Sequence, residues 1–135
     1  MKRTAAFVQE HLKDDTARLI LNKAKWPGIN IDLAVSCIES RSKLKNKVQD
    51  WYDNPELVFS VRLSAEQCSS SATAIYKARL AAEIAGEDMR LADLTGGLGV
   101  DSWYFAKFAS EVLYNEMQEA LCKAAEYNFK ELGTN

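Results

Sequence analysis

Three of the chain's six glycines lie within four positions, and this cluster constrains the fold more than any other feature. Gly96, Gly97 and Gly99 follow a short apolar run at residues 91–94. Glycine adopts positive φ at no steric cost and lets a ligand approach the backbone closely. The pattern predicts a tight turn between a strand that ends at Asp93 and a helix over residues 100–108.

The segments on both sides of this turn predict further strands and helices. Residues 72–85 are alanine-rich, follow the polar stretch 67–71, and predict a helix that Gly86 ends. Residues 112–114 predict a second strand, and residues 117–132 predict a helix with one apolar face. That face consists of Met117, Leu121, Ala124, Ala125, Asn128 and Leu132. The order helix, strand, loop, helix, strand, helix is the opening of a doubly wound α/β sheet, incomplete in this chain.

Residues 1–63 are predicted to form a separate helical N-terminal subdomain. The apolar spacing predicts one helix to about residue 25, capped by Asp14 or Asp15, and another over residues 32–50, capped by Asp32. Residues 57–63 alternate in polarity and predict a short extended segment. The distribution of charge supports this division. Residues 1–63 carry a net charge of +3 and residues 64–135 a net charge of −5, which together give −2.

Composition excludes several classes of protein. The chain has 135 residues, of which 47% are hydrophobic and 27% charged, as is usual for globular domains and unlike disordered or fibrous ones. No apolar run approaches the ~20 residues of a membrane helix, and the first residues lack the apolar core of a signal peptide, so the expected location is the cytoplasm. Three widely spaced cysteines and a single histidine, His11, predict neither disulfides nor a metal site.

Glu116 adds a chemical signal to the glycine loop. It follows the second predicted strand, 17 residues after Gly99. A carboxylate at this place accepts hydrogen bonds from ribose hydroxyls, so loop and acid together predict a nucleoside-containing cofactor. Ser102 stands where a dinucleotide fingerprint has its third glycine, which disfavours a nicotinamide enzyme. The alternative is a tight strand–helix turn without a ligand.

The segment Ala-Asp-Leu-Thr-Gly-Gly-Leu-Gly-Val-Asp at 92–101 resembles the first motif of class I S-adenosylmethionine-dependent methyltransferases. Glu116 lies where that family has its ribose-binding acid. Residues 66–78 resemble the segment before this motif in bacterial RNA methyltransferases with a THUMP-like domain, relatives of trimethylguanosine synthase. The resemblance covers residues 64–133, and 31–63 more loosely, so 64–135 is identified as the first part of a methyltransferase domain.

The resemblance implies a set of cofactor-binding residues. The backbone of Gly96, Gly97 and Gly99 would approach the amino-acid portion of S-adenosylmethionine, Asp93 would hold its ammonium group, and Glu116 its ribose. Gln67, Ser69 and Ser70 would line the methionine end of the cofactor, and the remaining members of the set are Thr95 and Asp101. Asp101 is equally well explained as an acid in the first turn of a helix.

The resemblance also implies methyl transfer, with RNA as the acceptor. The family's catalytic motif, of the Asn-Pro-Pro-Tyr type, follows a fourth strand, whereas this chain reaches only the second. The sequence Asn-Pro-Glu-Leu at 54–57 lacks the second proline and the aromatic residue, and we interpret it as a helix stop. We therefore expect an N-terminal piece of a larger methyltransferase that is inactive alone, with its catalytic residues elsewhere, and that self-associates through its unfinished sheet. The alternative is a non-catalytic nucleotide- or RNA-binding module.

Two groups of side chains have both an interpretation as RNA contacts and a structural one. Arg41, Lys43, Lys45 and Lys47 would suit either RNA phosphates or a solvated helix face, which is the more common role of such a run. Trp26, Trp51 and Tyr52 could stack on bases, but packing in the interior is the expected role.

Overall fold

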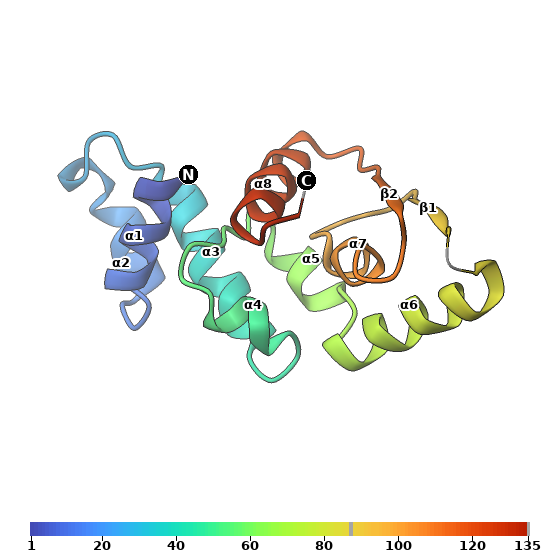
Figure 1. Cartoon of the computed structure of the whole chain (residues 1–135). Coiled ribbons are helices and arrows are strands. Elements are labelled where there is room, and N and C mark those ends of the chain that lie inside the picture. Colours follow the sequence, from blue (N-terminus) through green and yellow to red (C-terminus); the bar gives the residue numbers. More distant parts are fainter. Residues whose placement is uncertain (87, 135) are drawn as a thin grey trace.

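The computed structural model describes residues 1–86 and 88–134; position 135, the last of the predicted second domain, lies outside this range. The chain is mostly helical with a small parallel sheet (Figure 1). None of the described helices has both the length and the apolar character needed to cross a membrane. The elements are α1 (Lys2–Glu10), α2 (Thr16–Leu21), the 3-10 helix η1 (Lys23–Lys25), α3 (Ile31–Leu44), α4 (Gln49–Asp53), α5 (Arg62–Gln67), α6 (Ser71–Ala85), β1 (Arg90–Asp93), α7 (Val100–Phe105), β2 (Glu111–Tyr114) and α8 (Glu119–Glu131).

Side-chain caps define the starts of three helices. Asp15 accepts a hydrogen bond from the Ala17 amide at 2.9 Å, which confirms one of the two caps predicted for this helix. The predicted cap Asp32 is wrong: Asn30 accepts from the Leu33 amide at 3.0 Å, and Asp32 lies in the first turn of α3. Ser70 caps α6 in the same way, because its hydroxyl accepts from the amide of Thr73, the third residue of the helix.

The predicted helix over 32–50 is interrupted in the structure. Helix α3 ends at Leu44, Asn46 has a φ of 60°, and α4 begins at Gln49. Lys47 fixes the break, because its ammonium group donates to the carbonyls of Ala65 and Glu66 at 3.2 and 2.6 Å. Leu44 at the end of α3 and Trp51 of α4 pack in the same buried cluster, so the apolar spacing continues across the break and sequence periodicity predicted one helix.

Arg41 does not lie on a solvated helix face. Its side chain is buried, and its two terminal nitrogens donate to the carbonyls of Tyr52, Asn54 and Leu57 at 2.7, 3.0 and 2.9 Å. Burial lowers the pKa of this guanidinium. Arg41 therefore holds the Asn54–Pro55 turn, which ends α4 as predicted, and is excluded as an RNA contact.

Residues 57–61 belong to no helix or sheet, the backbone of Val61 is extended, and residues 62–63 already belong to α5. Asn128 of α8 takes the place of a partner strand. Its side-chain oxygen accepts from the Val58 amide at 2.9 Å, and its nitrogen donates to the Val58 carbonyl at 2.8 Å. The predicted extended segment is thus wrong for residues 62–63, which are helical, and α5 spans the predicted division between 63 and 64.

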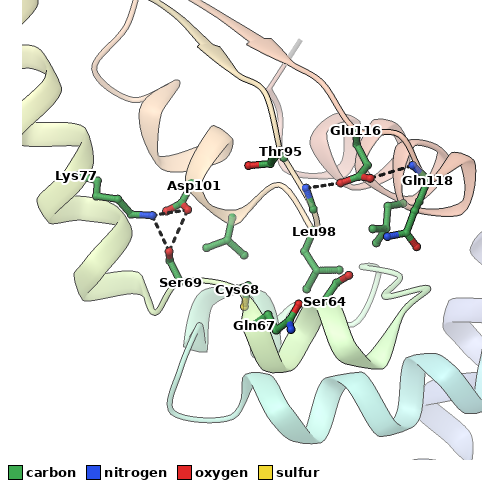
Figure 2. Close-up of a pocket in the computed structure, with 14 residues that line it drawn as sticks. Ser64, Gln67, Cys68, Ser69, Lys77, Thr95, Leu98, Asp101, Glu116 and Gln118 are labelled. Atoms are coloured by element: carbon green, nitrogen blue, oxygen red, sulfur yellow. Dashed lines mark hydrogen bonds and ion pairs between the residues drawn. The ribbon is translucent and has the colours of Figure 1, made fainter.

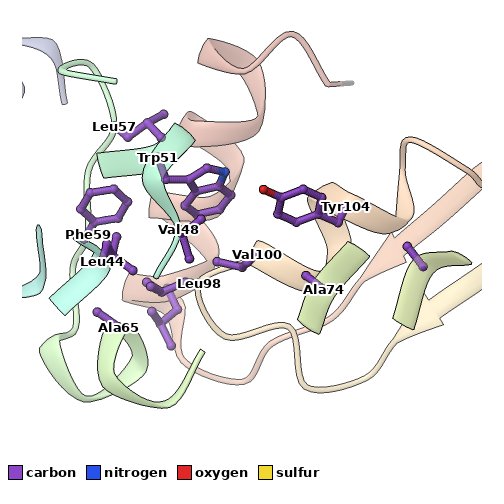
Figure 3. Packing of buried hydrophobic residues seen from close by; sticks show 12 residues of the cluster. Leu44, Val48, Trp51, Leu57, Phe59, Ala65, Ala74, Leu98, Val100 and Tyr104 are labelled. Carbon is purple, nitrogen blue, oxygen red and sulfur yellow. The ribbon is translucent and has the colours of Figure 1, made fainter. Parts of the chain in front are cut away.

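Two buried clusters meet at α8. One lies among α1, α2 and α3, where Tyr127 of α8 packs against it. The other joins α3–α8 and includes Trp51, Phe59, Leu98 and Leu121. Figure 3 shows Trp51 at its centre, between Phe59 and Tyr104. Trp51 is fully buried, which confirms its expected role in the core.

The sheet consists, in the described residues, of β1 and β2, which run parallel with Arg90 opposite Glu111 and Asp93 opposite Tyr114. Both strands were predicted to within one residue at most of their ends, and α7 forms the crossover between them. The predicted inward face of the last helix is confirmed for its four buried members. It is wrong for Met117, which lies before α8 and is 94% exposed.

Candidate functional site

A cavity of about 420 Å³ lies at the carboxyl ends of β1 and β2 (Figure 2). This is the edge at which open α/β sheets bind their ligands, and the volume falls within the roughly 300–1,000 Å³ of small-molecule sites. Helix α5, the first half of α6, the β1–α7 loop and the β2–α8 connection surround it. Seven predicted site residues line it: Gln67, Ser69, Thr95, Gly96, Gly97, Asp101 and Glu116.

Hydrogen bonds between the two loops hold Glu116 beside the glycines. The Asn115 amide donates to the Asp93 carbonyl at 2.9 Å, and the Gly96 amide donates to the Asn115 carbonyl at 2.8 Å. The Asn115 side chain donates to the Leu94 carbonyl at 2.9 Å. These bonds continue the pairing of β1 with β2 beyond the strand ends, so the positions of loop and acid are coupled.

The Glu116 carboxylate is held by backbone donors. The Gln118 amide donates to Oε1 at 2.9 Å and the Gly97 amide to Oε2 at 3.0 Å. The Gln118 bond, followed by the Gly97 bond, lowers the pKa of Glu116. The carboxylate is therefore ionised at neutral pH, and its remaining lone pairs can accept two further hydrogen bonds.

Each of the three positions requires glycine for a different structural reason. A side chain on Gly97 would extend into open space, with only the Thr95 carbonyl oxygen near it at 3.9 Å, although its φ of +55° is unfavourable for other residues. A Cβ on Gly96 would collide with the Tyr114 ring, and one on Gly99 would lie 2.5 Å from the Phe129 ring. Two of the glycines thus make room for aromatic side chains, and only Gly97 faces free space over the cavity.

Asp93, Gly99 and Ser70 do not line the cavity, although all three were predicted as cofactor contacts. The Asp93 carboxylate accepts from the Ser102 hydroxyl at 2.6 Å and from the Thr95 amide at 3.3 Å. It therefore joins the end of β1 to α7. Ser102, which replaces the third glycine of a dinucleotide fingerprint, is the buried partner in this bond.

Lys77 is a cavity residue that sequence reasoning missed. Its Nζ contacts Asp101 Oδ2 at 2.5 Å and Ser69 Oγ at 2.8 Å, and the Ser69 hydroxyl donates to the same carboxylate oxygen at 3.0 Å. Lys77 lies in the segment that resembles the methyltransferases, but Asp101 is 24 residues away, so no local spacing predicts the pair.

Comparison with known proteins supports a methyltransferase-like fold. A scan against protein-family models found no match, and a search of curated proteins found none either. The chain is similar to the crystal structure of a putative methyltransferase from Porphyromonas gingivalis W83, with a TM-score of 0.81 and 28% sequence identity. The similarity covers 99% of this chain and 32% of that one, so the chain spans about a third of its length. The resemblance read from the sequence is thus supported at the level of a methyltransferase.

Proposed function

We propose that this chain binds S-adenosylmethionine in the cavity and contributes to methyl transfer. The observation that carries the proposal is the similarity to a methyltransferase over almost the whole chain. The meeting of the glycine loop and Glu116 at the ends of two parallel strands supports it.

The residues present fit this cofactor. The free space over Gly97 admits a ligand close to the backbone, and Glu116 retains lone pairs for two ribose hydroxyls. Leu98, Val100 and Leu121 give the cavity an apolar wall against which the adenine base can pack.

The chain's own contribution to the reaction is binding and orientation. S-adenosylmethionine, when bound, supplies an activated methyl group on a sulfonium. Glu116 would fix the ribose, and the Gly97 backbone would set how closely the cofactor approaches the loop. Holding reactants in a productive geometry can supply ~7–11 kcal/mol of a reaction barrier.

The groups that orient the acceptor are proposed to lie outside these 135 residues, in the remainder of a larger enzyme. RNA is the acceptor that we propose, on the sequence resemblance alone. The chain by itself is then expected to transfer no methyl group from labelled S-adenosylmethionine to bulk RNA. Transfer by the isolated chain would contradict this division of roles.

Calorimetric titration tests the cofactor site. Charge-assisted hydrogen bonds contribute roughly 1.5–3 kcal/mol each, and ~1.4 kcal/mol is a tenfold change in affinity. Glu116→Ala should therefore weaken S-adenosylmethionine binding at least about tenfold. Gly97→Val should weaken it further, because a β-branched side chain enters the free space and resists positive φ. Glu83→Ala removes an exposed acid on α6 that does not line the cavity and is the matched control.

If a folded Glu116→Ala chain binds S-adenosylmethionine with unchanged affinity, the cofactor assignment is wrong and the loop is a structural turn. If a longer protein containing this chain binds S-adenosylmethionine but transfers no methyl group, the alternative of a non-catalytic binding module is favoured.

A further inference from the structure

One part of the cavity has no role in the function proposed above. Figure 2 shows Lys77, Ser69 and Asp101 together on one side of the cavity, with Glu116 and Gln118 on the other. The three side chains come from α6, from the segment before it and from the first turn of α7. Tertiary structure thus places a cation, an anion and a hydroxyl within hydrogen-bonding distance of one another.

The ion pair is only partly buried and only partly satisfied. The side chains of Lys77 and Asp101 are 41% and 27% exposed. An ammonium group has three donors, and Lys77 uses two of them, on Ser69 and Asp101. Asp101 Oδ1 has no hydrogen-bond partner among residues 1–86 and 88–134 and is shielded from solvent. The cluster therefore retains one donor on the cation and one acceptor on the anion.

A zwitterion complements this pair. If Lys77 turns to an incoming carboxylate, the Asp101 carboxylate becomes free to accept from an incoming ammonium group. One ion pair within the protein is then replaced by two ion pairs with the ligand, and the ammonium group of the ligand takes the place of Lys77 at Asp101 Oδ2.

The total charge of the lining disfavours a phosphate at this place. The charged lining residues are Lys77, Asp101 and Glu116, which sum to −1. S-adenosylmethionine carries +1 in total, from a sulfonium, an ammonium and a carboxylate group. A nucleoside diphosphate or dinucleotide would instead bring at least two negative charges to two carboxylates and a single cation.

We propose that Lys77, Asp101 and Ser69 form the subsite for the zwitterionic α-amino-acid group of the cofactor. Lys77 binds its carboxylate and Asp101 its ammonium, while Glu116 holds the ribose. The proposal rests on the proposed function above. It assigns to Asp101 the role that the sequence resemblance implied for Asp93, whose carboxylate is bonded to Ser102 and Thr95 instead.

Two ligands that share the 5′-methylthioadenosine part test the subsite, and they differ in the amino-acid chain and in the positive charge that this chain gives the sulfur. S-adenosylmethionine has the amino-acid group, and 5′-methylthioadenosine has the same nucleoside without it. Calorimetry on the 135-residue chain should show that Lys77→Met and Asp101→Asn weaken S-adenosylmethionine binding about tenfold or more. Both variants should leave 5′-methylthioadenosine binding within twofold. Lys77→Arg keeps the charge and should retain most of the affinity.

Lys130→Met is the matched control, because it removes a lysine from an exposed ion pair with Glu126 on α8, and Lys130 does not line the cavity. It should change neither affinity. Thermal unfolding of each variant verifies that the chain is folded.

The possible results separate the two proposals. If the unaltered chain binds neither ligand, the proposed function is overturned, and the subsite with it. If it binds S-adenosylmethionine and Lys77→Met leaves this affinity unchanged, or weakens both ligands equally, only the subsite is overturned. The pair is then a structural link between α6 and α7.

Discussion

Replacing Arg41 with methionine should destabilise the fold by about 3 kcal/mol. Methionine keeps much of the apolar stem but removes the guanidinium that donates to the carbonyls of Tyr52, Asn54 and Leu57. A buried acceptor without a partner costs about 1–3 kcal/mol. The Leu57 carbonyl lies in a buried bond and bears this cost in full, whereas Tyr52 and Asn54 are only partly buried and regain some hydration.

A second contribution acts in the opposite direction. Arg41 forms no ion pair with the described carboxylates, and burial lowers its pKa, so its removal also relieves the desolvation of a charge. The sum of the two effects remains near 3 kcal/mol. For a chain of this size 1 kcal/mol corresponds to roughly 3–5 °C in Tm, so the melting temperature should fall by about 9–15 °C.

Thermal and urea unfolding followed by circular dichroism measure the effect. Lys45→Met, at the exposed end of the same helix, should change stability by less than about 0.5 kcal/mol. Arg41→Lys should be intermediate, because one ammonium group cannot replace both terminal nitrogens. If Arg41→Met unfolds within about 1 kcal/mol of the unaltered chain, the guanidinium does not hold the turn and the reasoning is refuted.

Three further predictions concern two contacts in the interior and the exposed side chains at the sheet. Asn128→Leu leaves the amide and carbonyl of Val58 without their partners and should cost about 2–4 kcal/mol in urea unfolding; a change below 1 kcal/mol would contradict this. Gly99→Ala places a Cβ 2.5 Å from the Phe129 ring at a φ of +89° and should cost about 2–4 kcal/mol, part of which Phe129→Leu should restore in the double variant. Leu94 and Leu113 at the small sheet are 69% and 62% exposed, so the chain should self-associate, and a stable monomer in sedimentation at high concentration would argue against it.

Local sequence was sufficient for the elements around the glycine loop. The strands, the helix between them and the helix bounded by Ser70 and Gly86 all follow from signals a few residues long. Glycine conformation, side-chain caps and apolar spacing act between near neighbours, so they can be read before the chain is folded. The same signals predicted that the loop and Glu116 would meet, because parallel strands end at one edge of the sheet.

Only the tertiary structure determined which distant residues contact one another. Asn128 pairs with a backbone 70 positions away, and Lys77 pairs with Asp101 24 positions away. Two of the glycines are required by the rings of Tyr114 and Phe129 rather than by a ligand. Arg41 has the spacing of a surface residue, yet it is buried because the chain turns back over it. Such contacts form only when distant segments pack together, and composition and periodicity do not record which segments will meet.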